Sequence, residues 1–304
     1  MTYLTKQTSE TKDLYQQITD QIIEALSQST NWVMPWHQKA LTLPKNVATK
    51  KPYTGVNILS LWAAAHKNNY NSFLWGTYNQ WKNLGIQVRK GEKGHTIVFY
   101  KDFEVEEKNK EMGEFELVKR FVLKASTVFN ADQVGGFNTL IEPQSLLRGS
   151  FYTIDRAEEF VIKTEAKIVN SFTSAFYHYS QDVIGMPAED LFMETSNQTE
   201  EENYYSTLFH ELIHWTGHKS RLDRISPAAH FDSESYAIEE LIAELGSAFL
   251  CAELGVSTYP RQDHANYIAS WLKILKNDKK AIFHAARKAT QAVDYLKKLQ
   301  PPEF

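Results

Sequence analysis

The sequence predicts an α+β protein of two domains, a mixed helix and β-hairpin domain followed by a mostly helical domain with a small sheet. Three observations support this prediction: helical periodicity near both ends, two alternating segments that flank a charged stretch, and a linker containing Gly, Pro and Ser. A chain of 304 residues is long enough for two such domains. We expect the first to span residues 1–140, the linker 141–150 and the second 151–304.

Apolar spacing locates the elements of the first domain. A period near 3.6 predicts helices over 11–26 and 56–66, and the aromatic-rich stretch 71–83 predicts a third, short helix. Alternation predicts strands over 95–103 and 117–129, joined by a charged loop over 104–116. The two strands therefore form a hairpin.

The second domain is expected to begin with a helix from Asp155 to about Ile168. An edge strand follows over 175–184 and ends at Gly185-Met186-Pro187. Two helices around residues 206–216 and 235–251 come next, and 263–299 is mostly helical. The candidate chemistry lies on the first two of these helices.

Composition restricts the class of protein. A hydrophobic share of 42% and a charged share of 23% are typical of a globular protein. The single cysteine, Cys251, excludes disulfides within the chain, which fits a reducing cytoplasm. The N-terminus lacks a signal-peptide pattern, and no segment approaches 18 consecutive apolar residues, so we expect a cytoplasmic protein without a membrane partner.

The segment His210-Glu211-Leu212-Ile213-His214 lies in an apolar, helix-like stretch. Residues four apart share one face of a helix, so His210 and His214 can converge on one metal ion. Glu211 would then deprotonate a water molecule activated by the metal. The alternative, a surface helix with incidental His residues, conflicts with the apolar neighbours, because a buried carboxylate is costly unless something charged pairs with it. The motif predicts a zinc-dependent metalloprotease, with another divalent metal such as Mn²⁺ as the alternative cofactor.

Catalytic zinc normally takes three protein ligands and leaves one position open. His218 lies about 12 Å from His210 along a continuous helix, too far to share the ion. The better candidates are on the second helix, where Glu240 and Glu244 are four residues apart. By similarity to gluzincins, Glu240 is assigned as the third ligand and Glu244 as a carboxylate that orients an imidazole. Glu239 and Glu244 stay open as alternative ligands.

The first domain is basic and rich in tryptophan. Between residues 31 and 101 there are ten basic residues and one acid, and five of the seven Trp. Lys and Arg neutralise phosphates and aromatic rings stack on unpaired bases, so this composition favours single-stranded nucleic acid, although many of the Trp are equally expected in the core. Two loops, 48–55 and 89–95, look best placed. The candidate DNA-binding residues are Lys50, Lys51, Tyr53, Arg89, Lys90, Lys93, Trp36 and Trp75.

Several motifs together resemble one family. They are the stretch Trp32 to Trp36, Lys51-Pro52-Tyr53-Thr54-Gly55-Val56-Asn57, Val88 to Gly94, Val128 to Val134, His210 to His218, Ser220-Arg221-Leu222 and Glu239 to Leu245. They resemble ArdC-type antirestriction proteins, which combine an N-terminal single-stranded DNA-binding domain with a C-terminal zincin-like domain. The resemblance implies a bacterial plasmid or mobile-element protein that protects incoming DNA from host restriction. A host restriction protein or another peptide would be the substrate.

Two function classes follow. The first is a metalloprotease brought to its target by a single-stranded DNA-binding domain. The second is a non-catalytic DNA-binding protector whose metal site is structural. A metal-dependent nuclease is a weaker third class, because nuclease sites rely more on carboxylates and paired metals than on two His of one helix.

Overall fold

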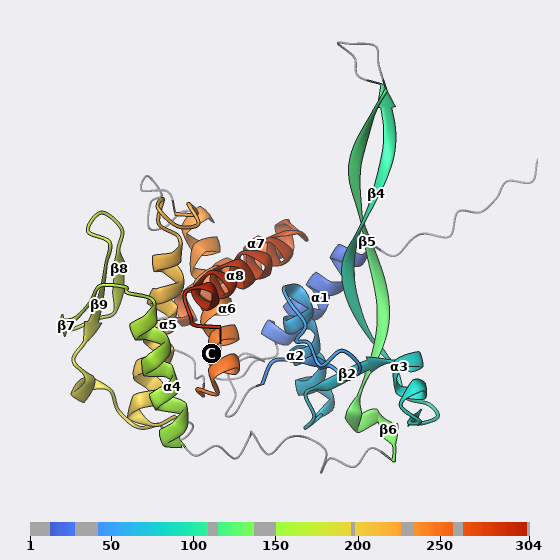
Figure 1. Cartoon of the computed structure of the whole chain (residues 1–304), viewed down its shortest axis with the longest axis horizontal. Helices are drawn as coiled ribbons and strands as arrows, with labels where there is room; N and C mark the ends of the chain where they lie inside the picture. Colours follow the sequence, from blue (N-terminus) through green and yellow to red (C-terminus); the bar gives the residue numbers. More distant parts are fainter. Residues whose placement is uncertain are drawn as a thin grey trace, which may run out of the picture.

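The computed structural model describes residues 13–27, 42–108, 115–136, 150–195, 198–225, 234–257 and 264–302. Most of the helices gather in one half of the molecule, and a long two-stranded ribbon extends from the other half (Figure 1). The predicted α+β class is therefore confirmed. Within the described ranges, no helix combines the length and apolar character needed to cross a membrane.

The described N-terminal part holds two longer helices, one short helix and a four-stranded sheet. Helices α1 (Leu14–Ser27) and α2 (Val56–Asn68) lie where the periodicity predicts them. The sheet has the order β1-β2-β5-β4, and a separate pair joins β3 to β6. Its strands are β1 (Lys45–Asn46), β2 (Leu74–Thr77), β4 (His95–Lys108) and β5 (Phe115–Asn130), and the pair is β3 (Gln87–Val88) and β6 (Val134–Gly135).

The prediction of one helix over 71–83 is wrong in its first half. Residues 74–77 form β2, which pairs with β5, and only Tyr78–Asn83 is helical, as α3. Thr77 ends the strand and starts the helix, because its side chain and that of Gln80 form a capping box. Trp75 is 1% exposed, so burial against the sheet outweighed the helical spacing of the aromatics.

The predicted loop over 104–116 is also mostly wrong. Strand β4 continues to Lys108 and β5 begins at Phe115, and the two stay in register from His95–Val128 to Lys108–Phe115. Residues 109–114 lie outside the described part of the chain. The ribbon extends away from the body (Figure 1). Residues 104–108 keep their backbone partners on β5, so the strand pairing continues through the charged stretch.

The C-terminal part begins with α4 (Ser150–Lys163), which ends earlier than predicted. Glu165 has a left-handed φ of 57°, a conformation that stops a helix. Residues 168–172 instead form β7, parallel to β9. The predicted linker over 141–150 lies outside the described residues except for Ser150.

The predicted edge strand over 175–184 is two strands. The small sheet has the order β7-β9-β8, with β7 (Ile168–Phe172), β8 (Phe176–His178) and β9 (Val183–Pro187). A turn at Asp182, with φ of 50°, separates β8 from β9. Gly185 and Pro187, expected to end the strand, belong to the central strand β9. The edge position predicted for this region is held by β8 alone.

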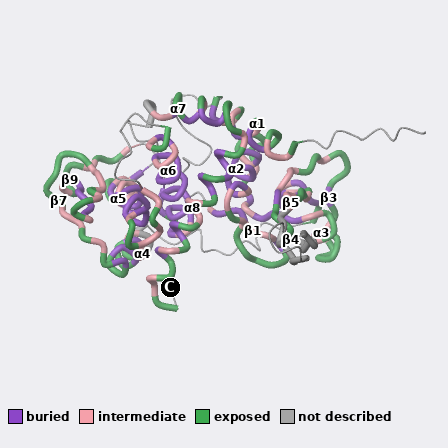
Figure 2. Tube along the Cα trace, turned by 90° about the horizontal axis from the view of Figure 1, so that it is seen from above, coloured by how far each residue is buried: buried purple, intermediate pink, exposed green. Residues whose placement is uncertain are grey.

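Four helices complete the fold. They are α5 (Glu200–Thr216), α6 (Glu234–Leu254), α7 (His264–Asn277) and α8 (Ala281–Lys298). Helix α6 lies among the other three and is buried along most of its length (Figure 2). Its acidic residues therefore lie inside the protein instead of on a solvated face.

The largest hydrophobic cluster is shared between the N- and C-terminal parts. It joins residues of α1 and α2 with residues of α4, α5, α6, α7 and α8. Trp62 of α2 packs against Phe249 of α6, with ring centroids 5.8 Å apart. Polar contacts reinforce the junction: Thr19 donates to the carbonyl of Lys279 at 2.7 Å, and the Gly55 amide donates to Thr290 Oγ1 at 3.1 Å. The helix that carries the candidate glutamates thus rests on the N-terminal part.

We expect Trp62→Ala to lower the free energy of unfolding by about 3–5 kcal/mol, because it removes a large buried ring from this shared core. Urea denaturation monitored by circular dichroism measures the change. Trp62→Phe is the control, since it keeps a ring against Phe249 and loses mainly the indole hydrogen bond to Thr42, worth about 1 kcal/mol. A change below about 1 kcal/mol for Trp62→Ala would contradict a shared core.

Candidate metal centre

Helix α5 presents two imidazoles to the interior. Thr199 caps the helix, with Glu202 completing a capping box. His210 and His214, one turn apart, are both buried on the side that faces α6. Their Nε2 atoms are 3.2 Å apart, as the helical spacing predicts.

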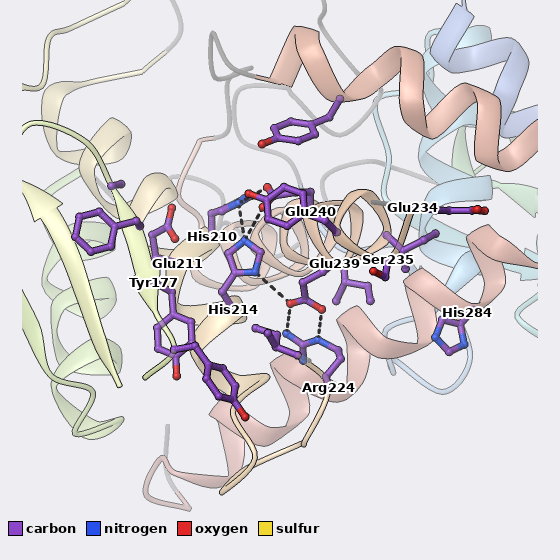
Figure 3. A pocket seen from close by; sticks show the side chains of 18 residues that line it. Tyr177, His210, Glu211, His214, Arg224, Glu234, Ser235, Glu239, Glu240 and His284 are labelled. Atoms are coloured by element: carbon purple, nitrogen blue, oxygen red, sulfur yellow. Dashed lines mark hydrogen bonds and ion pairs between the residues drawn. The ribbon is translucent and has the colours of Figure 1, made fainter. Parts of the chain in front are cut away.

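Helix α6 supplies a carboxylate at the same point. An added Cβ at Gly246 would lie 2.8 Å from Ile213, so this glycine lets α6 approach α5 closely. Glu240 Oε2 is 3.4 Å from His210 Nε2, and Glu240 Oε1 is 3.4 Å from His214 Nε2. Within the described part of the chain, these three side chains form a cluster able to hold a metal ion (Figure 3).

The spacing fits a divalent ion. Three ligand atoms, each about 2.0–2.2 Å from a tetrahedral ion, lie about 3.3–3.6 Å from one another. The two Nε2 atoms are 3.2 Å apart, and each lies 3.4 Å from a different oxygen of the Glu240 carboxylate, so an ion held by the imidazoles would be within reach of this carboxylate. Two imidazoles and one carboxylate also form a ligand set that zinc and other first-row divalent metals accept.

The other glutamates of α6 contact the imidazoles from outside this triad. Glu239 Oε1 is 3.1 Å from His214 Nδ1, so it contacts the ring nitrogen that faces away from the site. Glu244 Oε2 is 3.9 Å from His210 Nδ1 and is buried, on the side where an orienting carboxylate was predicted. The sequence indicated Glu239 only as an alternative ligand, because helical spacing carries no signal for its contact with His214.

His218 lies elsewhere. Its Nδ1 is 2.7 Å from Ser220 Oγ, and its ring packs against Tyr179 at a centroid distance of 4.7 Å. Its exclusion on helical geometry agrees with this placement.

The histidines and glutamates of the cluster shift one another's pKa values. Burial disfavours the charged form of His214, but Glu240 and Glu239 outweigh it and raise the pKa of His214 to about 10. Burial likewise acts to raise the pKa of Glu240, yet His214 and His210 hold it well below its ordinary value. The pKa of Glu239 is also lowered, because hydrogen bonds with His214 and Arg224 outweigh its burial. Without a metal, the cluster therefore holds a protonated imidazole between carboxylates.

A cavity of about 610 Å³ opens over the cluster. It extends from Tyr177 on β8 to His284 on α8, and Glu211 lies beside His210 on the side of the small sheet (Figure 3). Tyr236 and Tyr267 also line it, and the Tyr236 hydroxyl hydrogen-bonds the Glu240 carboxylate. Tyr236 carried no sequence signal, since a tyrosine four residues before a glutamate is a common helical pair.

The candidate DNA-binding residues have different surroundings. Lys50, Lys51, Arg89, Lys90 and Lys93 are exposed, as expected. Arg89, however, bonds Glu92 and the carbonyls of Asp132 and Val134, so much of its guanidinium shapes its own loop.

The predicted aromatic contacts are less favourable. Tyr53 is half-buried and its hydroxyl accepts from Asn46 at 3.1 Å. Trp75 is wrong as a base-stacking residue, because its ring is buried against Tyr70 and His95. Trp36 lies outside the described residues.

Two family models match the chain. Residues 12–129 match the N-terminal domain of the anti-restriction factor ArdC, and residues 155–288 match a zincin-like metallopeptidase domain. A curated relative, the uncharacterized protein y4eC of Sinorhizobium fredii, is 42% identical over 290 residues, covering 93% of this chain and 91% of the relative. A DNA primase TraC of Escherichia coli is 36% identical over 303 residues, but the chain spans only 27% of that protein.

Solved structures show the same fold. The metal-free crystal structure of the antirestriction protein ArdC from plasmid R388 matches with a TM-score of 0.76 at 40% identity, covering 94% of this chain and 97% of that protein. Its Mn(II)-bound structure matches with a TM-score of 0.73 at 39% identity, covering 94% and 98%. The chain therefore belongs to the ArdC family of antirestriction proteins, with an ArdC N-terminal domain followed by a zincin-like metallopeptidase domain.

Proposed function

We propose that this chain protects incoming DNA from restriction in a bacterial cytoplasm by binding single-stranded DNA and hydrolysing a peptide at a divalent metal centre. The observation that carries the catalytic part is the convergence of His210, His214 and Glu240, with one ligand atom of each within 4.8 Å of the others and Glu211 beside them in an open cavity. Zn²⁺ and Mn²⁺ both suit the ligands, and Mn(II) occupies the R388 relative.

The residues divide the chemistry between them. A divalent metal held by the triad would polarise a peptide carbonyl and lower the pKa of water towards about 7. Glu211 would accept the proton of the attacking water and deliver it to the leaving amine. The Tyr236 hydroxyl, which lines the same cavity, donates to the Glu240 carboxylate and would help to orient this ligand. A host restriction protein or another peptide is the proposed substrate class.

Strand β8 would align that peptide. It is one of the two edge strands of the small sheet, and its residues Phe176 and Tyr177 line the cavity. An extended peptide adds to an exposed strand edge through main-chain hydrogen bonds. Arg221 and Asp182 hold the turn after β8 to the end of α5, because Arg221 binds Asp182, the Tyr177 hydroxyl and the carbonyl of Trp215.

A direct test is metal content combined with proteolysis. The purified chain is expected to bind one Zn²⁺ or Mn²⁺ per molecule and to cleave a labelled unfolded protein such as casein only with metal present. A chain that binds no divalent metal stoichiometrically would refute the proposed centre. Binding without cleavage would favour the alternative, a DNA-binding protector with a structural metal.

DNA binding is expected to depend on the two exposed basic loops. The double variants Lys50→Ala/Lys51→Ala and Lys90→Ala/Lys93→Ala should each weaken binding to a single-stranded oligonucleotide. Because each lost phosphate contact removes about 0.7 from the slope of log affinity against log salt, each pair should reduce the slope by about 1.4. Fluorescence anisotropy at several salt concentrations measures it.

The matched control is Lys273→Ala/Lys276→Ala, which removes the same charge from exposed positions of α7. Its slope should stay that of the unaltered protein. Equal slopes for all three double variants would show that the loops do not contact phosphate.

A further inference from the structure

The loop after α5 folds back over the end of its helix. Gly217 caps α5, and its carbonyl accepts from the amides of Arg224 and Ile225, both at 2.9 Å. The Leu222 amide reaches the carbonyl of Thr216 at 3.0 Å. The last carbonyls of a helix have no partner within the helix, so these bonds stabilise the turn that carries His214. They also bring the Arg224 side chain over that turn.

The guanidinium of Arg224 joins α5 to α6. Its Nε and Nη2 bind the two oxygens of Glu239 at 2.7 and 2.8 Å, a bidentate pair. Nη2 also donates to the carbonyl of Ile213 at 2.7 Å, and Nη1 donates to Thr216 Oγ1 at 3.1 Å. The side chain is only 6% exposed, so these contacts are shielded from solvent. Figure 3 shows the chain of contacts from Arg224 through Glu239 to His214.

Glu239 links Arg224 to His214, one of the three candidate metal ligands. With its carboxylate 3.1 Å from Nδ1 of His214, the proton of a neutral ring is held on Nδ1. The lone pair is then on Nε2, the atom that faces His210 and Glu240. A buried carboxylate needs a charged or hydrogen-bonded partner, and Arg224 provides both. Neither residue would hold its position without the other.

We propose that Arg224 is a positioning residue of the metal centre, fixing the orientation of His214 through Glu239 and fixing the end of α5 through Ile213 and Thr216. This inference rests on the proposed metal site but not on peptide hydrolysis. An arginine suits the role because its planar fork serves four acceptors at once, whereas lysine carries the same charge as a single point with three donors.

The test is metal titration of the metal-free full chain with Zn²⁺ and with Mn²⁺ by calorimetry. Arg224→Lys and Arg224→Met are expected to weaken binding by about 10–100-fold, the usual effect of removing a residue that orients a ligand, with the stoichiometry kept at one. Glu239→Gln should have a similar effect. Adding it to Arg224→Met should change little further, because both substitutions interrupt the same path.

Arg221→Lys is the matched control. Arg221 is a second largely buried arginine of the same loop, but its guanidinium binds Asp182 and the Trp215 carbonyl in place of Glu239. Its substitution should leave metal affinity within about threefold, within the tolerance of independent sites. If the substitutions acted only by disrupting the loop, Arg221→Lys would weaken metal binding as much as Arg224→Lys does.

Gly217→Ala covers the case in which Arg224 variants fail to fold. An added Cβ would lie 3.0 Å from Arg224 Nη2 and 2.7 Å from Ile225. The substitution therefore moves the guanidinium from its position but leaves the arginine in the chain. The inference is supported if Gly217→Ala weakens metal binding, by less than the Arg224 variants do, while the metal-free chain unfolds at the same temperature as the unaltered protein. Unchanged affinity in Arg224→Lys, Arg224→Met or Gly217→Ala overturns it. An unaltered chain that binds no metal would instead overturn the proposed site itself.

Discussion

Glu211→Gln is expected to lower peptide hydrolysis by about 10²–10⁴-fold while leaving the metal stoichiometry unchanged. Glu211 is buried beside His210 and lines the cavity, yet it is not a member of the metal-binding triad. Glutamine has the same shape but cannot accept a proton, so the substitution removes the base and keeps the ligands. Casein cleavage and metal content, measured on the same preparation, give both quantities.

Glu201→Gln is the matched control, because it makes the same change at an exposed position in the first turn of the same helix. It should leave hydrolysis unaltered. Transfer of unmodified DNA into a restricting host adds a second measurement, in which Glu211→Gln should lose protection together with hydrolysis. Protection that survives the substitution would show that the DNA-binding part acts without proteolysis.

Metal binding is expected to tighten steeply with pH. His214 has a pKa of about 10 in the metal-free protein, because Glu240 and Glu239 overcome the effect of its burial. It is therefore protonated at pH 7, while a metal requires its neutral imidazole. The metal must displace this proton, so the apparent affinity should rise about tenfold per pH unit up to about pH 10. Calorimetry at pH 6–9 in buffers of different ionisation enthalpy measures both the affinity and the protons released.

The same pKa fixes the direction of the stability change. Because the folded pKa of His214 lies above its unfolded value of about 6.5, its charged form stabilises the metal-free chain below that pH. This contribution is lost as the pH rises from about 6.5 to 10. Bound metal should remove the dependence, since the proton has already left.

His284→Gln is the control for the pH experiment. His284 lines the cavity on α8 but lies outside the triad, so its removal should leave the proton release unchanged. An affinity that stays flat between pH 7 and pH 9 would mean that His214 is already neutral without metal. That result would contradict the electrostatic description of the site and leave its ligand geometry untouched.

The sequence was most informative where one helix carries the information. The spacing of His210 and His214 predicts their convergence, because residues four apart share a face whatever surrounds the helix. The hairpin strands and the helices α1 and α2 followed from periodicity in the same way. The excess of basic over acidic residues between positions 31 and 101 indicated the two basic loops, because the exposure of a lysine does not depend on a specific tertiary contact.

Tertiary packing decided the rest. Glu239 and Glu240 are neighbours on one helix, and only the approach of α5 at Gly246 places Glu240 beside the two Nε2 atoms and Glu239 beside Nδ1. Composition alone made Trp75 a candidate for base stacking, and only the structure shows that its ring is buried in the sheet.

Arg224 carries no sequence pattern at all, because its role depends on a loop that returns over the helix end. Local spacing determines which residues share a face. Contacts between residues distant in sequence determine which of those residues reach the site.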